Sequence, residues 1–149
     1  MQERDRCVVQ AGAVAIGGRA MAILGPPGCG KSSLALALID RGAQLIGDDG
    51  VTLSREEGPD GLRLVAVPPP NIQGLIEIAG IGIVRLPLAE PTPLALVLDL
   101  GRMGPRLPET LDMREWMGVA IPVLPFAPNP VAAALRAEHA LALHGLPVV

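Results

Sequence analysis

The feature that most constrains this chain is a glycine-rich stretch near its start. Residues 25–32 read Gly-Pro-Pro-Gly-Cys-Gly-Lys-Ser, a glycine followed after four free positions by Gly-Lys-Ser. An apolar run at 20–24 precedes the stretch and a helix-forming run at 33–39 follows it. This order of strand, loop and helix is the context in which the motif acts as a phosphate-binding loop. The sequence therefore predicts an α/β fold.

The residue types of this loop suit a nucleoside triphosphate. Glycines let the backbone approach a ligand closely, and the N–H groups of the loop and of the helix start attract anions. Lys31 is expected to reach the β- and γ-phosphates and Ser32 to place its hydroxyl on Mg²⁺. The predicted nucleotide-binding residues are Gly25, Pro26, Pro27, Gly28, Cys29, Gly30, Lys31, Ser32 and Ser33.

Length and composition narrow the class of protein. The chain has 149 residues, which suits a single domain over 1–149. Its net charge of −3, with one Trp, one Phe and no Tyr, argues against a nucleic-acid surface. Two cysteines make no disulfide framework, the charged start is unlike a signal peptide, and no apolar run is long enough to span a membrane. We expect a cytoplasmic protein without a membrane partner.

Two adjacent acids follow the next expected strand. Residues 43–46 are expected to form the next strand, and Asp48 and Asp49 follow it after Gly47. Asp-Asp-Gly is also good turn chemistry, so a plain surface turn is the alternative. Ligands of open α/β sheets bind at the carboxyl ends of strands, and a strand after the loop helix would bring this pair beside the phosphates. We therefore expect a functional role.

Two further acids leave alternatives open. Glu77 lies in the otherwise apolar run 75–84, where a carboxylate needs a partner or a metal unless it faces solvent from an edge strand or short helix. Asp99 ends the apolar strand pattern 94–98, as the metal-binding aspartate of many phosphate-loop enzymes does. A turn residue before Gly101 is the favoured interpretation of Asp99.

The remaining pattern predicts short elements. Strands are expected at 7–9 and 13–16, the second joined by a Gly-Gly turn to the strand that feeds the loop, and a hairpin at 51–54 and 62–64. Residues 113–116 suggest a helical turn, and the strand 119–124 is expected at an edge because it contains Pro122. A helix is expected from Asn129-Pro130 to about His144.

Three of these stretches together resemble a known family. The loop 25–32, the segment 41–49 (Arg-Gly-Ala-Gln-Leu-Ile-Gly-Asp-Asp) and the segment 75–83 (Leu-Ile-Glu-Ile-Ala-Gly-Ile-Gly-Ile) follow one another as they do in the catalytic domain of HPr kinase/phosphorylase. The chain is most similar to the short alphaproteobacterial form, which lacks the N-terminal domain. The resemblance implies a phosphate-loop domain with a mixed sheet, like HPr kinase and PEP carboxykinase.

The resemblance also implies an activity and a site. The family phosphorylates a serine of HPr, a small phosphocarrier protein, with ATP and Mg²⁺, and commonly assembles as hexamers. By position, Asp48 would take the serine proton and Lys31 would hold the transferred phosphate, while Ser32 and Glu77 would bind Mg²⁺. Asp49 is a further candidate metal ligand and acidic neighbour of Asp48.

Some positions depart from the family pattern. Gln10 aligns with a catalytic histidine, Ala79 replaces the arginine of the Glu-Ile-Arg-Gly signature, and a late arginine with its loop has no clear match around 122–129. These departures predict weak or absent reverse phosphorolysis. They also motivate one alternative, an ATP-binding regulatory relative. A small-molecule kinase or general NTPase that uses Asp99 as its metal ligand is the other.

Overall fold

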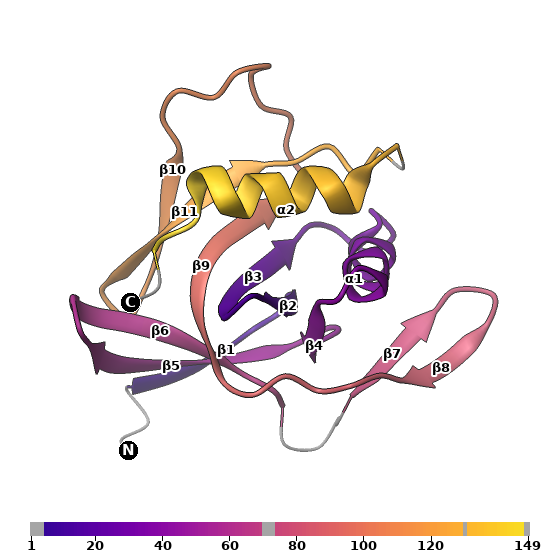
Figure 1. Ribbon diagram of the computed structural model, residues 1–149, viewed down its shortest axis with the longest axis horizontal. Coiled ribbons are helices and arrows are strands. Elements are labelled where there is room, and N and C mark those ends of the chain that lie inside the picture. Colours follow the sequence, from indigo (N-terminus) through magenta and orange to yellow (C-terminus); the bar gives the residue numbers. More distant parts are fainter. Residues whose placement is uncertain (1–4, 70–73, 130, 148–149) are drawn as a thin grey trace.

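The computed structural model describes residues 5–69, 74–129 and 131–147. Two helices lie against a curled, mainly antiparallel and partly parallel sheet, and a separate hairpin projects from one side (Figure 1). The elements in chain order are β1 (Arg6–Val9), β2 (Gly12–Ile16), β3 (Arg19–Leu24), α1 (Lys31–Asp40), β4 (Gln44–Gly47), β5 (Val51–Gly58), β6 (Gly61–Val67), β7 (Leu75–Ile78), β8 (Gly82–Arg85), β9 (Thr92–Asp99), β10 (Asp112–Trp116), β11 (Val119–Pro125) and α2 (Ala133–His144).

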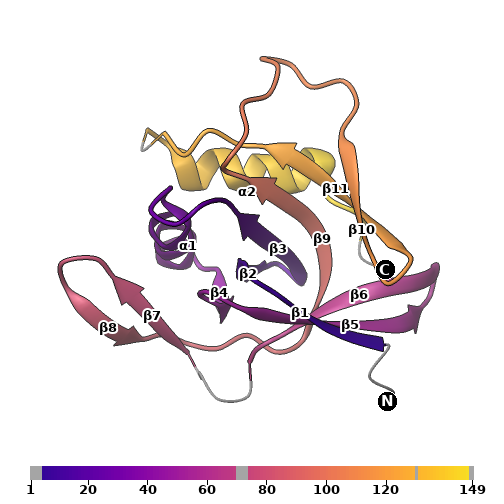
Figure 2. The same cartoon turned by 180° about the vertical axis from the view of Figure 1, so that it is seen from behind.

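The sheet branches at β9. Its main path runs β1-β5-β6-β9-β3-β2-β4. One edge of β9 pairs with β3 along most of its length, whereas the other edge pairs first with β6, at Thr92 and Pro93, and then with β11, from Val97 to Asp99. Since β9 is shared by two branches, the sheet curls around it instead of remaining flat (Figure 2).

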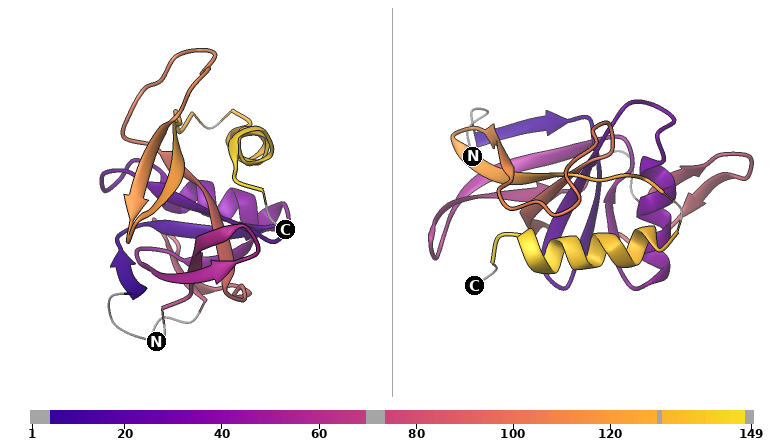
Figure 3. Two further views of the ribbon diagram at one scale, coloured as in Figure 1. Left: turned by 90° about the vertical axis from the view of Figure 1, so that its left-hand side faces the viewer. Right: turned by 90° about the horizontal axis from the view of Figure 1, so that it is seen from above.

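Alternating side chains give the sheet two buried faces. On one face, Met21 and Ile23 of β3 and Leu98 of β9 pack with the apolar sides of α1 and α2. On the other, Ala22 and Val97 pack with residues of the β5–β6 and β10–β11 hairpins. Small residues face the second layer at β2 and β3, which lets the hairpins approach closely. Figure 3 shows both helices on the same side of the central strands.

Several expected elements are present with small changes of length. The Gly17-Gly18 turn joins the antiparallel strands β2 and β3. Helix α1 contains the expected helix-forming run 33–39, and β5 and β6 form the predicted hairpin with longer strands. Two hydrogen bonds at its end, from the N–H groups of Arg41 and Gly42 to carbonyls of the last helical turn, close α1 before β4.

Two predictions about the strands of the C-terminal part are wrong. Residues 113–116 belong to β10, because they pair with β11 across the Met117-Gly118 turn. Strand β11 lies inside the sheet and β10 is at the edge; Pro122 is tolerated because the pairing of β11 with β9 begins one residue later.

The last helix also starts later than expected. It begins at Ala133, and the side chain of Asn129 instead accepts a bond of 2.9 Å from the N–H of Val131. Ala132 is left-handed (φ 52°), so this bond closes a turn before the helix and does not cap it. Gly145 ends the helix as predicted.

In the described part of the chain, no helix is both long and apolar enough to cross a membrane.

Candidate active site

Strand directions bring the predicted site residues to one edge of the sheet. Strand β2 is antiparallel to both β3 and β4, and β3 is parallel to β9. The strands β3, β4 and β9 therefore end at the same edge. Leu24 leads there into the phosphate-binding loop, Gly47 leads to Asp48, and β9 ends at Asp99.

The phosphate-binding loop has the backbone that its glycines predict. Gly28 and Gly30 have positive φ values of 79° and 106°, which residues with a side chain rarely adopt. At Gly25 a Cβ atom would lie 2.6 Å from the Sγ of Cys29, so the loop is too tight for a larger residue. Lys31 Nζ donates to the carbonyls of Gly25 and Pro26, at 2.6 and 3.2 Å, which folds the ammonium group over the loop.

Asp48 joins two walls of the site. Its Oδ1 accepts a hydrogen bond of 2.8 Å from the hydroxyl of Ser32, and its Oδ2 accepts one of 3.1 Å from the backbone N–H of Glu77. Ser32 belongs to α1, directly after the loop, and Glu77 to the β7–β8 hairpin. The carboxylate that the sequence marks as the candidate base is therefore in contact with Ser32 and Glu77, two of the three predicted magnesium-binding positions.

A cavity of about 510 Å³ opens at this point. Lys31, Asp48, Asp49 and Glu77 all line it, although they come from α1, the β4–β5 turn and β7. The remaining lining residues are Pro27, Gly28, Gly30, Ser32, Ser33, Leu36, Ile78 and Ala79. The cavity thus contains one ammonium group, three carboxylates and two hydroxyls, a set suited to a phosphate chain with its cation.

Asp99 reaches the same edge and is used differently. Its Oδ1 accepts a bond of 2.9 Å from the N–H of Gly101, and its Oδ2 lies 3.1 Å from Nε of Arg102. Arg102 also donates to Asp112, at 3.2 Å. The lining of the cavity does not include Asp99. Its contacts match the interpretation of this residue as a strand-end turn.

The donor set fits a cation that is shared with a ligand. Among the described residues, no three His, Cys, Asp or Glu side chains lie close enough together to hold a metal ion by themselves. Mg²⁺ usually takes one or two protein carboxylates and completes its shell with water and substrate phosphates. Glu77, Asp49 and the hydroxyl of Ser32 suit that mode of binding.

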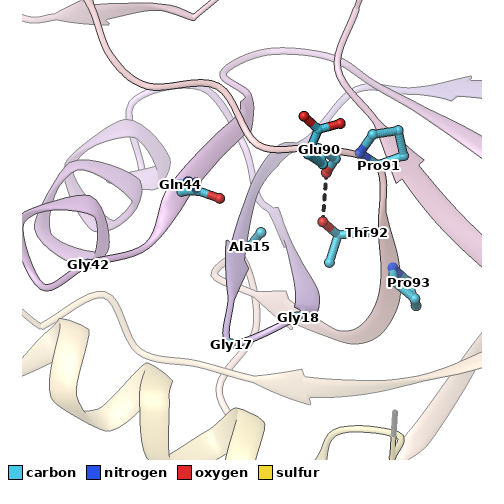
Figure 4. Close-up of a pocket in the computed structure, with 9 residues that line it drawn as sticks. All are labelled: Ala15, Gly17, Gly18, Gly42, Gln44, Glu90, Pro91, Thr92 and Pro93. Atoms are coloured by element: carbon cyan, nitrogen blue, oxygen red, sulfur yellow. Dashed lines mark hydrogen bonds between the residues drawn. The ribbon is translucent and has the colours of Figure 1, made fainter. Parts of the chain in front are cut away.

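A second cavity lies at the other end of these strands. It measures about 330 Å³ and is bordered by the Gly17-Gly18 turn, Gln44 and the start of β9 (Figure 4). Thr92 donates to the carbonyl of Glu90 there, at 2.7 Å. Glu90 is the one charged residue in its lining, and the cavity lies at the amino ends of β3 and β4, away from the phosphate-binding loop.

Two structural residues were not predicted from the sequence, one beside Asp48 and one in α2 outside the cavity lining. A Cβ atom at Gly47 would lie 2.0 Å from the carbonyl oxygen of Gly50, so the turn that carries Asp48 requires a glycine. Arg136 of α2 stacks on Phe126, with its guanidinium carbon 4.5 Å from the centre of the ring, and donates to the carbonyls of Ala127 and Asn129. The only sequence signal for Gly47 was its place before the acid pair, and Arg136 had none.

The cysteines are free thiols, as the sequence predicts. Cys29 lies within the phosphate-binding loop and Cys7 on β1. Burial raises the pKa of the Cys7 thiol, which keeps it protonated at neutral pH and makes it a poor nucleophile.

Comparison with known proteins identifies the family. The sequence pattern of the HPr Serine kinase C-terminal domain matches residues 4–88, which include the phosphate-binding loop, the acid pair and the β7–β8 hairpin. This match covers more than half of the chain. The chain belongs to the HPr kinase C-terminal domain family.

Individual relatives agree with this assignment. An HPr kinase/phosphorylase of Shouchella clausii is 44% identical over 73 residues, which is 49% of this chain and 23% of that protein. One from Enterococcus faecalis is 48% identical over 67 residues, 45% of this chain and 21% of that protein. The matched stretches thus span less than a quarter of the length of these relatives.

A solved structure matches the fold over a longer range. The HPr(Ser) kinase/phosphatase of Coxiella burnetii aligns with a TM-score of 0.69, over 92% of both chains and at 24% sequence identity. The structure is thus a phosphate-loop α/β domain with a mixed sheet, as the sequence predicted. The fold agreement extends to β9–α2, beyond the part that the HPr kinase family pattern matches.

Proposed function

We propose that this member of the HPr kinase family is an ATP-dependent kinase that phosphorylates a serine of an HPr-type phosphocarrier protein. The observation that carries the proposal is the position of Asp48, which lies in the cavity of the phosphate-binding loop and contacts Ser32 and Glu77. A carboxylate beside a phosphate site is the group a kinase uses to accept the proton of the attacking hydroxyl.

In this proposal each residue of the cavity has a separate task. The loop from Gly25 to Gly30 binds the phosphates through its N–H groups. Lys31 moves from the loop carbonyls to the transferred phosphate and balances its charge. Asp48 orients the serine hydroxyl of the carrier and takes its proton as the bond to phosphorus forms.

Mg²⁺ would be held by Ser32 and Glu77, and Asp49, which lines the same cavity, is a further candidate ligand. The ion would supply positive charge beside the phosphate oxygens. From the family resemblance we also propose that residues 1–149 form a single domain and that the protein works in the cytoplasm. The same resemblance suggests a homo-oligomer, since related enzymes form hexamers.

We propose in addition that reverse phosphorolysis is weak or absent. Gln10 follows β1 and is exposed. It lies three residues before Ala13, which pairs with Gly47 next to Asp48. An amide at this point cannot titrate near neutral pH as a histidine does. Ala79 lines the cavity without the charge that an arginine would bring.

The test is transfer of labelled phosphate from ATP to purified HPr-type carriers, with Mg²⁺ present. We expect transfer by the wild-type protein and a loss of roughly 10²–10⁴-fold in Asp48→Asn, the range for removal of a general base. ATP binding, measured by calorimetry, should persist in the variant. Binding of ATP by the wild-type protein without transfer to any carrier would contradict the proposal.

Gln10 and Ala79 also support a second candidate function. A relative that binds ATP and signals its presence without transferring phosphate needs the loop but neither a titrating partner at position 10 nor a charge at position 79. For such a protein, Asp48→Asn would leave every measurable function within a few-fold of wild type, and carriers would remain unlabelled.

A further inference from the structure

A single carboxylate connects two otherwise separate elements of this site. The β7–β8 hairpin projects away from the sheet (Figures 1 and 2, and the right-hand view of Figure 3). Its tip is exposed, with Ile81 and Ile83 77% and 72% accessible to solvent. Its base is held by Ile76, which is buried in the core beside α1, and by a bond of 2.7 Å from the N–H of Leu86 to the carbonyl of Gly74.

In the part of the chain that the structure describes, the edge of β7 that faces the cavity has no strand partner. Within the described residues β7 pairs with β8 alone, so N–H groups on its other edge need an acceptor elsewhere. Asp48 is the acceptor for Glu77, at 3.1 Å. This bond lies between the buried base of the hairpin and its exposed tip, and it is made by the residue whose side chain is the proposed metal ligand.

We propose that Asp48 is also the positioning residue for the hairpin. Its Oδ2 holds the backbone of Glu77 over the cavity while its Oδ1 holds the hydroxyl of Ser32 beside the phosphate-binding loop. One side chain therefore sets the separation of the two cavity walls. This inference concerns the site of the proposed kinase, but it depends only on the hydrogen bonds and not on phosphate transfer.

Two variants of Asp48 separate its hydrogen bonds to the cavity walls from its proposed role as a base. An asparagine at position 48 keeps an oxygen that accepts from Glu77, and its amide group donates to the hydroxyl of Ser32. It is nevertheless unable to take a proton as a base does. An alanine removes both acceptors. Asn should therefore preserve the position of the hairpin and Ala should not.

Hydrogen exchange of backbone amides, followed by NMR on the full chain without nucleotide, tests this directly. In the wild type we expect the amide of Glu77 to exchange at least about tenfold more slowly than in an unstructured chain. Asp48→Ala should remove that protection, Asp48→Asn should keep it within about threefold, and Asp49→Ala should leave it unchanged, since Asp49 makes no bond to the hairpin in the described structure. Amides of β3 and β9 serve as the internal reference for global stability.

Two results would overturn the inference. One is an unprotected Glu77 amide in the wild type, a reading that needs no variant and holds even if Asp48→Ala fails to fold. The other is an Asp48→Ala variant in which the Glu77 amide stays as protected as in the wild type while β3 and β9 exchange as before, since the bond to Asp48 would then not position the hairpin. Absence of phosphate transfer would refute the proposed function and leave this result standing.

Discussion

Asp48 and Asp99 occupy comparable places and have different surroundings. Asp48 follows β4 and Asp99 is the last residue of β9, and both strands end at the edge where the phosphate-binding loop lies. Asp48 receives a hydroxyl and a backbone N–H from two walls of a cavity, whereas both oxygens of Asp99 are engaged by its own loop, at Gly101 and Arg102. Position at a strand end therefore does not make an acid functional. The partners that its oxygens meet decide that.

The largest difference between the two regions is expected in a phosphate-transfer assay that compares Glu77→Ala with Asp99→Ala. Glu77→Ala takes a proposed metal ligand from the cavity and should lower phosphate transfer by about 100-fold, as loss of one transition-state contact does. Asp99→Ala should change it by less than about threefold, because Asp99 lies outside the cavity lining. A greater loss in Asp99→Ala than in Glu77→Ala would favour a small-molecule kinase with Asp99 as metal ligand.

The cations of the two regions give a second comparison, measured as ATP affinity by calorimetry. Lys31→Met removes the ammonium group that lies over the loop and should weaken ATP binding by roughly 10–100-fold, the cost of one charged hydrogen bond. Arg102→Met should leave ATP affinity unchanged, because Arg102 is committed to Asp99 and Asp112. Equal losses would show that the β9 loop takes part in nucleotide binding.

In the turn that carries Asp48, the free energy of unfolding should depend more on Gly47 than on Gly50. In Gly47→Ala the new Cβ would overlap the carbonyl oxygen of Gly50, so urea unfolding should show a loss of about 1–3 kcal/mol, as overpacking does. Gly50→Ala is the matched control, since a Cβ there meets nothing within 4 Å. If both variants unfold alike, the turn is looser than the contacts indicate.

The smallest effect is expected at the turn after β9. Asp99→Ala removes the acceptor of the Gly101 N–H and one ion pair of a half-exposed arginine. Unfolding free energy should fall by about 1 kcal/mol, and Asp99→Asn should recover most of it, because the amide oxygen also accepts from Gly101. No recovery in the asparagine variant would assign the stability to the ion pair instead.

Local patterns predicted the elements near the site well, and those near the end less well. The motif from Gly25 to Ser32, the apolar run before it and the helix after it are short-range features that the chain dictates by itself. The later strands depended on distant partners. Residues 113–116 form a strand because β11 lies beside them, and Pro122 is tolerated inside the sheet because β9 leaves its nitrogen unpaired.

The sequence by itself determined the phosphate-binding loop, the α/β class, the family and the acids of the candidate site. Only the tertiary structure decided which acids meet. Asp48 and Glu77 are far apart in the chain, and their contact follows from the direction of β4 and the placement of the β7–β8 hairpin. Asp99 has an equally suggestive local sequence, but Arg102 and Gly101 occupy its oxygens. The physical reason is that a hydrogen bond requires its two groups at a specific distance and direction, and long-range packing sets both.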